Sequence, residues 1–181
     1  QKIKLDEYPS AIKISSFQFE KEVDSTMWVA TTFGIVKYDM IAQTSNLYAT
    51  VPEEGPAYVL QRDNYGNLWA GGYGYGVMRY DEDKKAFKQY LNDPRNVNSL
   101  AENDVPEIIP IDEKRIWVTS ISAGIQEMNI EEETFTPILL DGQKINRVRT
   151  HFKDKDEYLW LGGDAGLHRY KDGEEMVYIT S

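Results

Sequence analysis

The chain has 181 residues, which is the length of one domain or of part of one. Its formal net charge of −10 argues against nucleic acid and anionic membrane surfaces as partners, and no apolar run is long enough for a membrane span or a signal peptide. Because cysteine is absent, a disulfide framework, a zinc–cysteine cluster and thiol chemistry are excluded for this segment.

The first two predicted units each centre on one tryptophan. Residues 10–51 contain the stretch TMWVATTFGIVKYD around Trp28, and residues 56–91 contain NLWAGGYGYGVMRYD around Trp69. The segment KIKL at 2–5 lies at the distance before Trp28 at which an outer strand precedes a tryptophan in the other units. It is therefore predicted to be the outer strand of a preceding unit.

The last two units repeat the same context. Residues 104–140 contain RIWVTSISAGIQEMN around Trp117, and residues 145–180 contain YLWLGGDAGLHRYK around Trp160. In every unit an acidic turn precedes the tryptophan, and a glycine followed by a branched aliphatic residue comes six or seven positions after it. These glycines are predicted to mark sharp turns or a close approach to the neighbouring unit.

The period of the repeat predicts the fold. The tryptophans are separated by 41, 48 and 43 residues. A repeat in the forties with several short strands and one tryptophan per unit is typical of a β-propeller, in which each unit is one blade. The predicted fold class is all-β, with four four-stranded antiparallel blades and each tryptophan in the second strand. The inner strands of the third and fourth blades are predicted at 105–111 and 145–152.

The glycine-rich stretch of the second unit does not fit a phosphate-binding loop. A dinucleotide fingerprint that starts at Gly72 requires a third glycine at position 77, and a P-loop that starts at Gly71 requires a lysine there. Val77 occupies that position. The stretch is therefore better explained as one copy of the repeat.

The repeats resemble a known family. The pattern D-x-x-G-x-L-W-x-G-T followed by G-G-L-x-R-Y-D is similar to the two-component regulator propeller repeat of the periplasmic sensor region in Bacteroides hybrid two-component systems. The linker NDPRNVNSLAENDV at 92–105 resembles the segment that joins consecutive blades in those sensors. The second and fourth units match best, whereas the first lacks the turn glycine and the third has Met128 and Asn129 in place of Tyr-Asp.

The resemblance implies a function. It implies that the chain supplies four blades of a larger, usually seven-bladed, propeller in the periplasm. Such propellers sense carbohydrate breakdown products and signal through a membrane helix to a histidine kinase outside this segment. The partners implied are an oligosaccharide or other small ligand and the remaining blades of the same propeller. Blade faces left open at both ends also predict a homo-oligomer.

No catalytic constellation is predicted. His151 and His168 both lie inside predicted strands, and neither is near a serine or cysteine motif. The acidic stretches at 81–83 and 131–133 fall in hairpins and miss the spacing of a calcium loop. We therefore expect no catalytic residue, no metal site and no cofactor, and we do not expect this chain to be an enzyme. Two alternatives stay open, namely a secreted propeller lyase and a structural propeller for protein interaction.

Ligand contacts are expected from loops at one end of the blades, over the central channel. Tyr73 and Tyr75 combine a flat ring with a hydroxyl group, which suits a sugar, although packing against the adjacent blade would also explain them. The loops that lead into the inner strands offer further polar groups. The residues predicted to bind the ligand are Tyr58, Tyr73, Tyr75, Arg95, Asn98, Glu107, Arg147 and Asp164.

Overall fold

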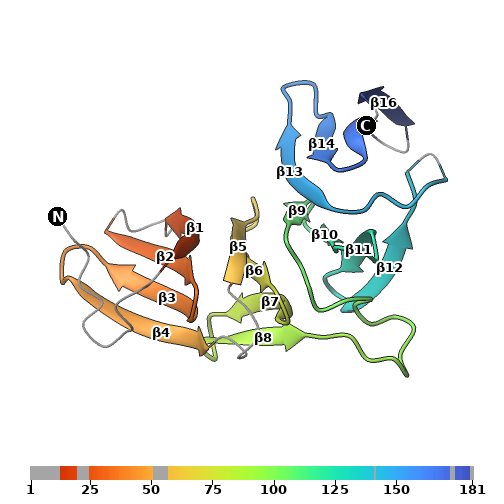
Figure 1. Cartoon of the computed structure of the whole chain (residues 1–181). Coiled ribbons are helices and arrows are strands. Elements are labelled where there is room, and N and C mark those ends of the chain that lie inside the picture. The colour runs from red at the N-terminus through yellow and green to blue at the C-terminus, as the bar shows by residue number, and fades with distance from the viewer. Residues whose placement is uncertain (1–12, 20–24, 51–56, 141, 172–173, 180–181) are drawn as a thin grey trace.

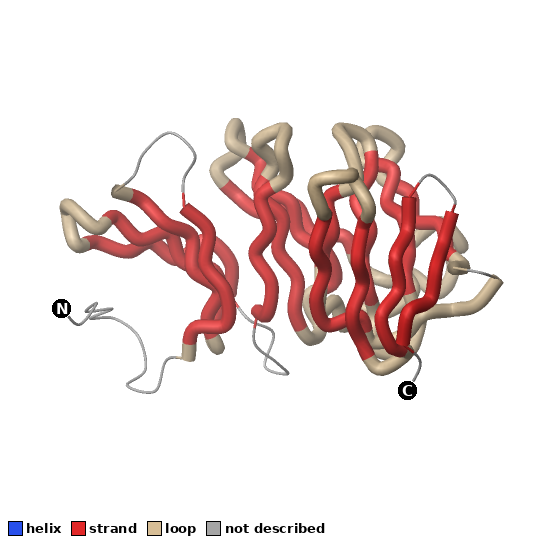
Figure 2. Tube along the Cα trace, turned by 90° about the horizontal axis from the view of Figure 1, so that it is seen from above, coloured by secondary structure: helices blue, strands red, loops and turns tan. Residues whose placement is uncertain are grey.

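The computed structural model describes residues 13–19, 25–50, 57–140, 142–171 and 174–179. These residues form sixteen strands in four antiparallel sheets of four strands each, and the described part of the chain contains no helix (Figure 2). Each sheet joins four strands that are consecutive in the chain, and the sheets are called blades 1 to 4. The predicted all-β architecture is confirmed. The segment at 2–5 lies outside the described residues.

The strand bounds follow the chain order. Blade 1 contains β1 (Ile14–Phe19), β2 (Thr26–Thr31), β3 (Gly34–Asp39) and β4 (Thr44–Thr50). Blade 2 contains β5 (Ala57–Arg62), β6 (Leu68–Gly72), β7 (Gly76–Asp81) and β8 (Ala86–Tyr90). Blade 3 contains β9 (Ile108–Pro110), β10 (Arg115–Thr119), β11 (Ile125–Asn129) and β12 (Thr134–Ile138). Blade 4 contains β13 (Val148–Lys153), β14 (Leu159–Gly163), β15 (Gly166–Lys171) and β16 (Glu174–Ile179).

The blades follow one another along an arc (Figure 1). The strands β1, β5, β9 and β13 lie on its concave side, and β4, β8 and β12 lie on its convex side. The first strand of each blade is therefore the inner strand, and the fourth is the outer strand, as in a propeller.

The four tryptophans occupy the second strand of their blades, as predicted. Trp28, Trp69 and Trp160 each lie opposite a basic residue of the third strand, whose charged group sits over the indole ring at 5.0 to 5.7 Å from the ring centroid. Trp117 lies opposite Glu127 instead and donates its indole N–H to that carboxylate at 3.0 Å. The tryptophan position is therefore shared by all blades, whereas its partner on the third strand varies.

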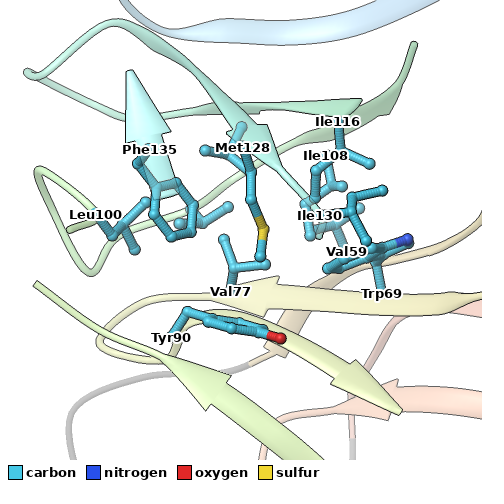
Figure 3. Packing of buried hydrophobic residues seen from close by; sticks show 12 residues of the cluster. Val59, Trp69, Val77, Tyr90, Leu100, Ile108, Ile116, Met128, Ile130 and Phe135 are labelled. Atoms are coloured by element: carbon cyan, nitrogen blue, oxygen red, sulfur yellow. The ribbon is translucent and has the colours of Figure 1, made fainter. Parts of the chain in front are cut away.

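Apolar clusters between blades hold the arc together. One buried cluster joins blades 2 and 3 and contains Trp69 and Val77 on one side and Ile116 and Met128 on the other (Figure 3). In the blade 1–2 cluster the ring of Trp28 lies 4.6 Å from that of Tyr80. Trp28, Trp69 and Trp117 therefore each pack onto the blade that follows. Because such packing removes large apolar areas from water, it is the main source of stability between blades.

The acidic turns before the tryptophans have a specific role. Asp63 is buried, and its carboxylate accepts the indole N–H of Trp69 at 3.0 Å and the backbone N–H of Asn67 at 2.8 Å. In blade 4, Asp154 accepts the indole N–H of Trp160 at 2.7 Å. Hydrogen bonds to the ring and the turn backbone together compensate the cost of burying this carboxylate.

The inner strands of blades 3 and 4 begin later than predicted. Strand β9 begins at Ile108, because Val105 donates its backbone N–H to Gly72 of blade 2 at 3.1 Å instead of pairing with β10. Strand β13 begins at Val148, because the φ angle of Arg147 is 53°, in the left-handed region, which interrupts a strand. Both interruptions lie at the same end of the inner strands.

Candidate ligand-binding site

A small hollow lies where blades 2, 3 and 4 meet, at the end of the inner strands. Its volume is about 200 Å³. Blade 2 contributes the β6–β7 loop, and blade 3 contributes the segment before β9 and the β10–β11 loop. Blade 4 contributes the start of β13. The residues that line this hollow, called the inter-blade pocket below, are Tyr73, Pro106, Ile121, Arg147, Val148 and Arg149.

Two guanidinium groups and one carboxylate form the charged side of the pocket. The Nε atom of Arg149 donates to Oδ1 of Asp164 at 2.9 Å, and Nη1 of Arg147 lies 3.5 Å from Oδ2 of the same carboxylate. The hydrogen bond from Arg149 lowers the pKa of Asp164 below its usual value, and the same bond raises the pKa of Arg149. Both groups are therefore charged at neutral pH.

Tyr73 forms the aromatic side of the pocket, and Tyr58 packs against it. The rings of Tyr58 and Tyr73 meet edge to face, with centroids 4.8 Å apart and an interplanar angle of 78°. Tyr58 is the extra residue of a β-bulge in β5, and Arg149 is the extra residue of the corresponding bulge in β13. Because a bulge re-aims one side chain out of the strand, it explains why Tyr58 and Arg149 are both exposed at this end.

Glu107 follows the lining residue Pro106, but its side chain contacts His151 of β13 instead of lining the pocket. Its Oε1 atom lies 2.9 Å from Nδ1 of His151, which links the segment before β9 to β13. Both side chains are mostly buried, with 17% and 20% of their side-chain surface exposed. The pair therefore connects the inner strands of blades 3 and 4.

Of the eight predicted residues, Tyr73 and Arg147 line the inter-blade pocket. Tyr58 and Asp164 each contact a lining residue, Glu107 follows the lining residue Pro106 in the chain, and three residues lie elsewhere. Tyr75 is buried in the cluster between blades 1 and 2, where burial raises the pKa of its hydroxyl group. The carbonyl of Asn98 accepts the backbone N–H of Phe135 in the outer strand β12 at 2.8 Å, and the exposed Arg95 pairs with Asp93 in the same linker. These three side chains therefore do not line the inter-blade pocket.

Four lining residues were not predicted from the sequence: Pro106, Ile121, Val148 and Arg149. Strand alternation does not single out Arg149, because the bulge in β13 leaves both Arg149 and Thr150 exposed after the buried Val148. The other lining residues depend on how three blades meet. No repeat pattern within one blade contains that information.

The end of the linker holds both loops of the pocket. Asp104 accepts the backbone N–H of Gly74 at 2.8 Å, and the Asn103 carbonyl accepts that of Gly76 at 2.8 Å. One carboxylate oxygen of Glu102 accepts the backbone N–H groups of Ser122 and Ala123 at 2.9 and 3.0 Å. The loops that carry Tyr73 and Ile121 are thus anchored to one segment of three residues, 102–104.

These anchors give an expected result for hydrogen exchange. In the Asp104→Ala protein, the Gly74 amide should exchange roughly 10- to 100-fold faster, because a hydrogen bond to a charged acceptor contributes about 1.5–3 kcal/mol. The Ser122 amide should stay unchanged. In Glu102→Ala the two responses should be reversed. Equal acceleration at both amides in both variants would show that the loops open as one unit.

A larger hollow of about 420 Å³ lies at the opposite end of β7, between hairpins of blades 2 and 3. Several of its charged groups already bind other groups of the lining. Lys84 binds Asp81 at 2.9 Å, Lys88 binds Glu133, and Arg79 donates to Asn67 at 2.8 Å. This hollow is therefore better explained as a network that links hairpins than as a ligand site.

The described residues contain no group of three or more histidine, cysteine, aspartate or glutamate side chains that could hold a metal ion. Within the same residues no helix is long and apolar enough to cross a membrane.

Comparison with known proteins supports the predicted resemblance. No family model matches the chain. The chain is 29% identical over 216 residues to a histidine kinase of Formosa agariphila, which covers 88% of this chain and 16% of that protein. An extracellular domain assigned to the hybrid two-component system BT3049 of B. thetaiotaomicron superposes with a TM-score of 0.75 at 16% identity, covering 97% of this chain and 24% of that one. The chain is similar to an extracellular domain of a hybrid two-component system.

Further structures agree on the fold. The extracellular domain assigned to the hybrid two-component system BT4673 of B. thetaiotaomicron superposes with a TM-score of 0.72 at 23% identity, covering 93% of this chain and 24% of that one. Virginiamycin B lyase from Staphylococcus aureus superposes with a TM-score of 0.65 at 13% identity, covering 93% of this chain and 60% of the lyase. At these identities the superpositions show the propeller fold alone. The chain spans about a sixth of the histidine kinase and a quarter of each extracellular domain.

Proposed function

We propose that the chain is part of the periplasmic sensor region of a hybrid two-component system and binds a carbohydrate-derived ligand at the inter-blade pocket. The signal would pass to a histidine kinase outside this chain. The extracellular domains that superpose on the chain support an extracytoplasmic location. The observation that carries the proposal is the pocket itself, in which three blades place an aromatic ring beside hydrogen-bonding groups.

The size and chemistry of the pocket suit one sugar ring. Its volume of about 200 Å³ is below the roughly 300–1,000 Å³ of sites for drug-sized ligands. Tyr73 offers a ring face and a hydroxyl group, and Arg147 and Arg149 offer several N–H donors at fixed spacing. A terminal sugar of an oligosaccharide could therefore enter, while the rest of the chain would extend over the inner strands.

Ligand binding at this position would act on the arrangement of the blades. The contacts come from blade 2 through Tyr73, from blade 3 through Ile121 and from blade 4 through Arg149. A ligand that fits one arrangement of these elements better than another shifts the population toward it, and its differential affinity limits the size of the signal. The remaining blades of a larger propeller and a second copy of the protein would transmit that shift.

A lyase is the second candidate. The propeller fold is shared with virginiamycin B lyase, and the chain holds one pair of groups suited to proton transfer, Glu107 and His151, beside the pocket. The pair is mostly buried between two inner strands, which favours a structural role. Turnover of a bound saccharide would decide for the lyase.

The test is a calorimetric titration of the full-length protein with a panel of oligosaccharides. Tyr73→Ala should weaken binding of the active saccharide roughly tenfold or more, because the stacked ring is lost. Tyr65→Ala is the matched control, since it removes the same ring from an exposed position in the β5–β6 turn at the other end of the blade. Equal affinities of the two variants would place the ligand elsewhere, and no binding by any saccharide would contradict the proposal.

A further inference from the structure

The charges of the inter-blade pocket indicate which saccharides it takes. We infer that the ligand carries an anionic group, the carboxylate of a uronic acid or a sulfate ester, and that Arg149 and Arg147 hold this group. This inference rests on the proposed function, because it assumes that the pocket binds a saccharide. It adds the chemical class of that saccharide.

Both guanidinium groups have N–H donors that a ligand could bind. Arg149 uses its Nε–H on Asp164, and its terminal N–H groups have no partner among the described residues. Among the described residues, the side chain of Arg147 makes only the longer contact of 3.5 Å to Asp164. The two side chains are 68% and 54% exposed, so a ligand can reach them. Two cations thus share one carboxylate, and the fork of terminal N–H groups fits a carboxylate or a sulfate.

The other carboxylates near the pocket are engaged elsewhere. Glu102 binds the amides of the β10–β11 loop, Asp104 binds the amide of Gly74, and Glu107 binds His151. Asp164 is therefore the one of these carboxylates that contacts the arginines. The chain as a whole has 30 acidic and 20 basic side chains, so a pair of arginines at one pocket is not explained by composition.

The backbone at Arg147 is a second observation. Five described residues other than glycine have positive φ angles. Four of them, Gln43, Lys85, Glu133 and Glu157, lie in hairpin turns between consecutive strands. Arg147, with a φ of 53°, instead precedes an inner strand at the pocket. A residue held in this region costs about 1–3 kcal/mol, and such residues cluster at ligand sites.

The expected bound state follows from these positions. The anionic group accepts N–H groups from the free end of Arg149 and from Arg147, while the sugar ring lies against Tyr73. Asp164 keeps its bond to the Nε atom of Arg149 and so fixes the direction of the fork. A neutral sugar of the same size can use the ring contact but leaves the charged donors in water.

The experiment compares three oligosaccharides of equal length on the full-length protein: a galactan fragment, an oligogalacturonate and a sulfated galactan fragment. Titration calorimetry should show at least tenfold tighter binding of an acidic fragment than of the neutral one, and this preference should shrink at high salt. Arg149→Gln should remove most of the preference, because it should weaken binding of the acidic fragments more than binding of the neutral fragment. The arm that binds tighter, uronate or sulfate, identifies the anionic group.

Two controls keep the outcomes distinct. Lys84→Gln removes the same charge at an exposed lysine paired with Asp81, at the opposite end of β7, and should not change the preference. Arg149→Lys keeps the positive charge without the planar guanidinium group, and it should retain part of the preference for acidic fragments. If the neutral fragment binds as tightly as the acidic ones, the inference is wrong while the proposed function stands. If no fragment binds, both fail.

Discussion

Trp117→Ala is expected to lower the free energy of unfolding by about 3–5 kcal/mol, the range for deleting a buried tryptophan side chain. The ring is 2% exposed and belongs to the apolar cluster between blades 3 and 4. Its centroid lies 4.9 Å from that of Tyr170 in blade 4. Alanine would leave a cavity between the sheets and would also leave Glu127 without the indole N–H that it accepts.

Urea unfolding of the chain followed by circular dichroism measures this loss. Trp160→Ala is the graded control, because Trp160 holds the same second-strand position but is only half-buried in this chain. It should lose less stability, since the cost scales with the apolar area and the cavity that are involved. Equal losses at Trp117 and Trp160 would contradict the conclusion that Trp117 stabilises the protein by packing onto blade 4.

The fold could be predicted because its signal lies in large residues at a fixed period. Each blade needs one bulky ring at the same second-strand position, so Trp28, Trp69, Trp117 and Trp160 report the architecture directly. The inner strands were harder to bound. Their first residues interact with the neighbouring blade, as Val105 does with Gly72, and such pairing leaves no alternation in the local sequence.

The site could be predicted only in part, for a related reason. The expectation that loops at one end of the blades gather polar groups led to Tyr58, Tyr73 and Asp164, which do come together. Tyr75 is only two positions from Tyr73, yet the two rings point to different environments, a core and a pocket. Sequence patterns within a blade do not separate these cases, because the neighbouring blade decides which ring is covered.

In the linker at 92–105, the sequence suggested ligand contacts where the structure shows structural ones. Most of its polar groups form hydrogen bonds to other residues of the linker. Ser99 and Asp93 bind each other, and Asn92 binds the Leu100 carbonyl at 2.7 Å. Leu100 is fully buried between blades 2 and 3. The segment from 92 to 105 is therefore a structural strap, and its contribution to the site is to hold two loops in place.

Gly76→Ala is expected to destabilise the protein by roughly 2–5 kcal/mol, the sum of an unfavourable backbone conformation and a steric clash. The φ angle of Gly76 is 63°, which residues with a side chain rarely adopt. A Cβ atom would lie 2.1 Å from the carbonyl oxygen of Tyr90 and 3.2 Å from Cδ2 of Leu100. Because the first obstacle is backbone, β7 and β8 would have to separate at their Val77–Tyr90 pair.

Gly74→Ala separates the two contributions within the same loop. Its φ angle is 74°, but a Cβ atom there would meet no other atom within 4 Å. The free energy of unfolding of Gly74→Ala should therefore fall only by the cost of the left-handed backbone conformation, about 1–2 kcal/mol. The difference between the two variants in urea unfolding measures the clash alone. Equal stabilities would mean that β8 and the linker yield to the added methyl group, and the tight contact between the turn after β6 and the outer strand would then not be a constraint on the fold.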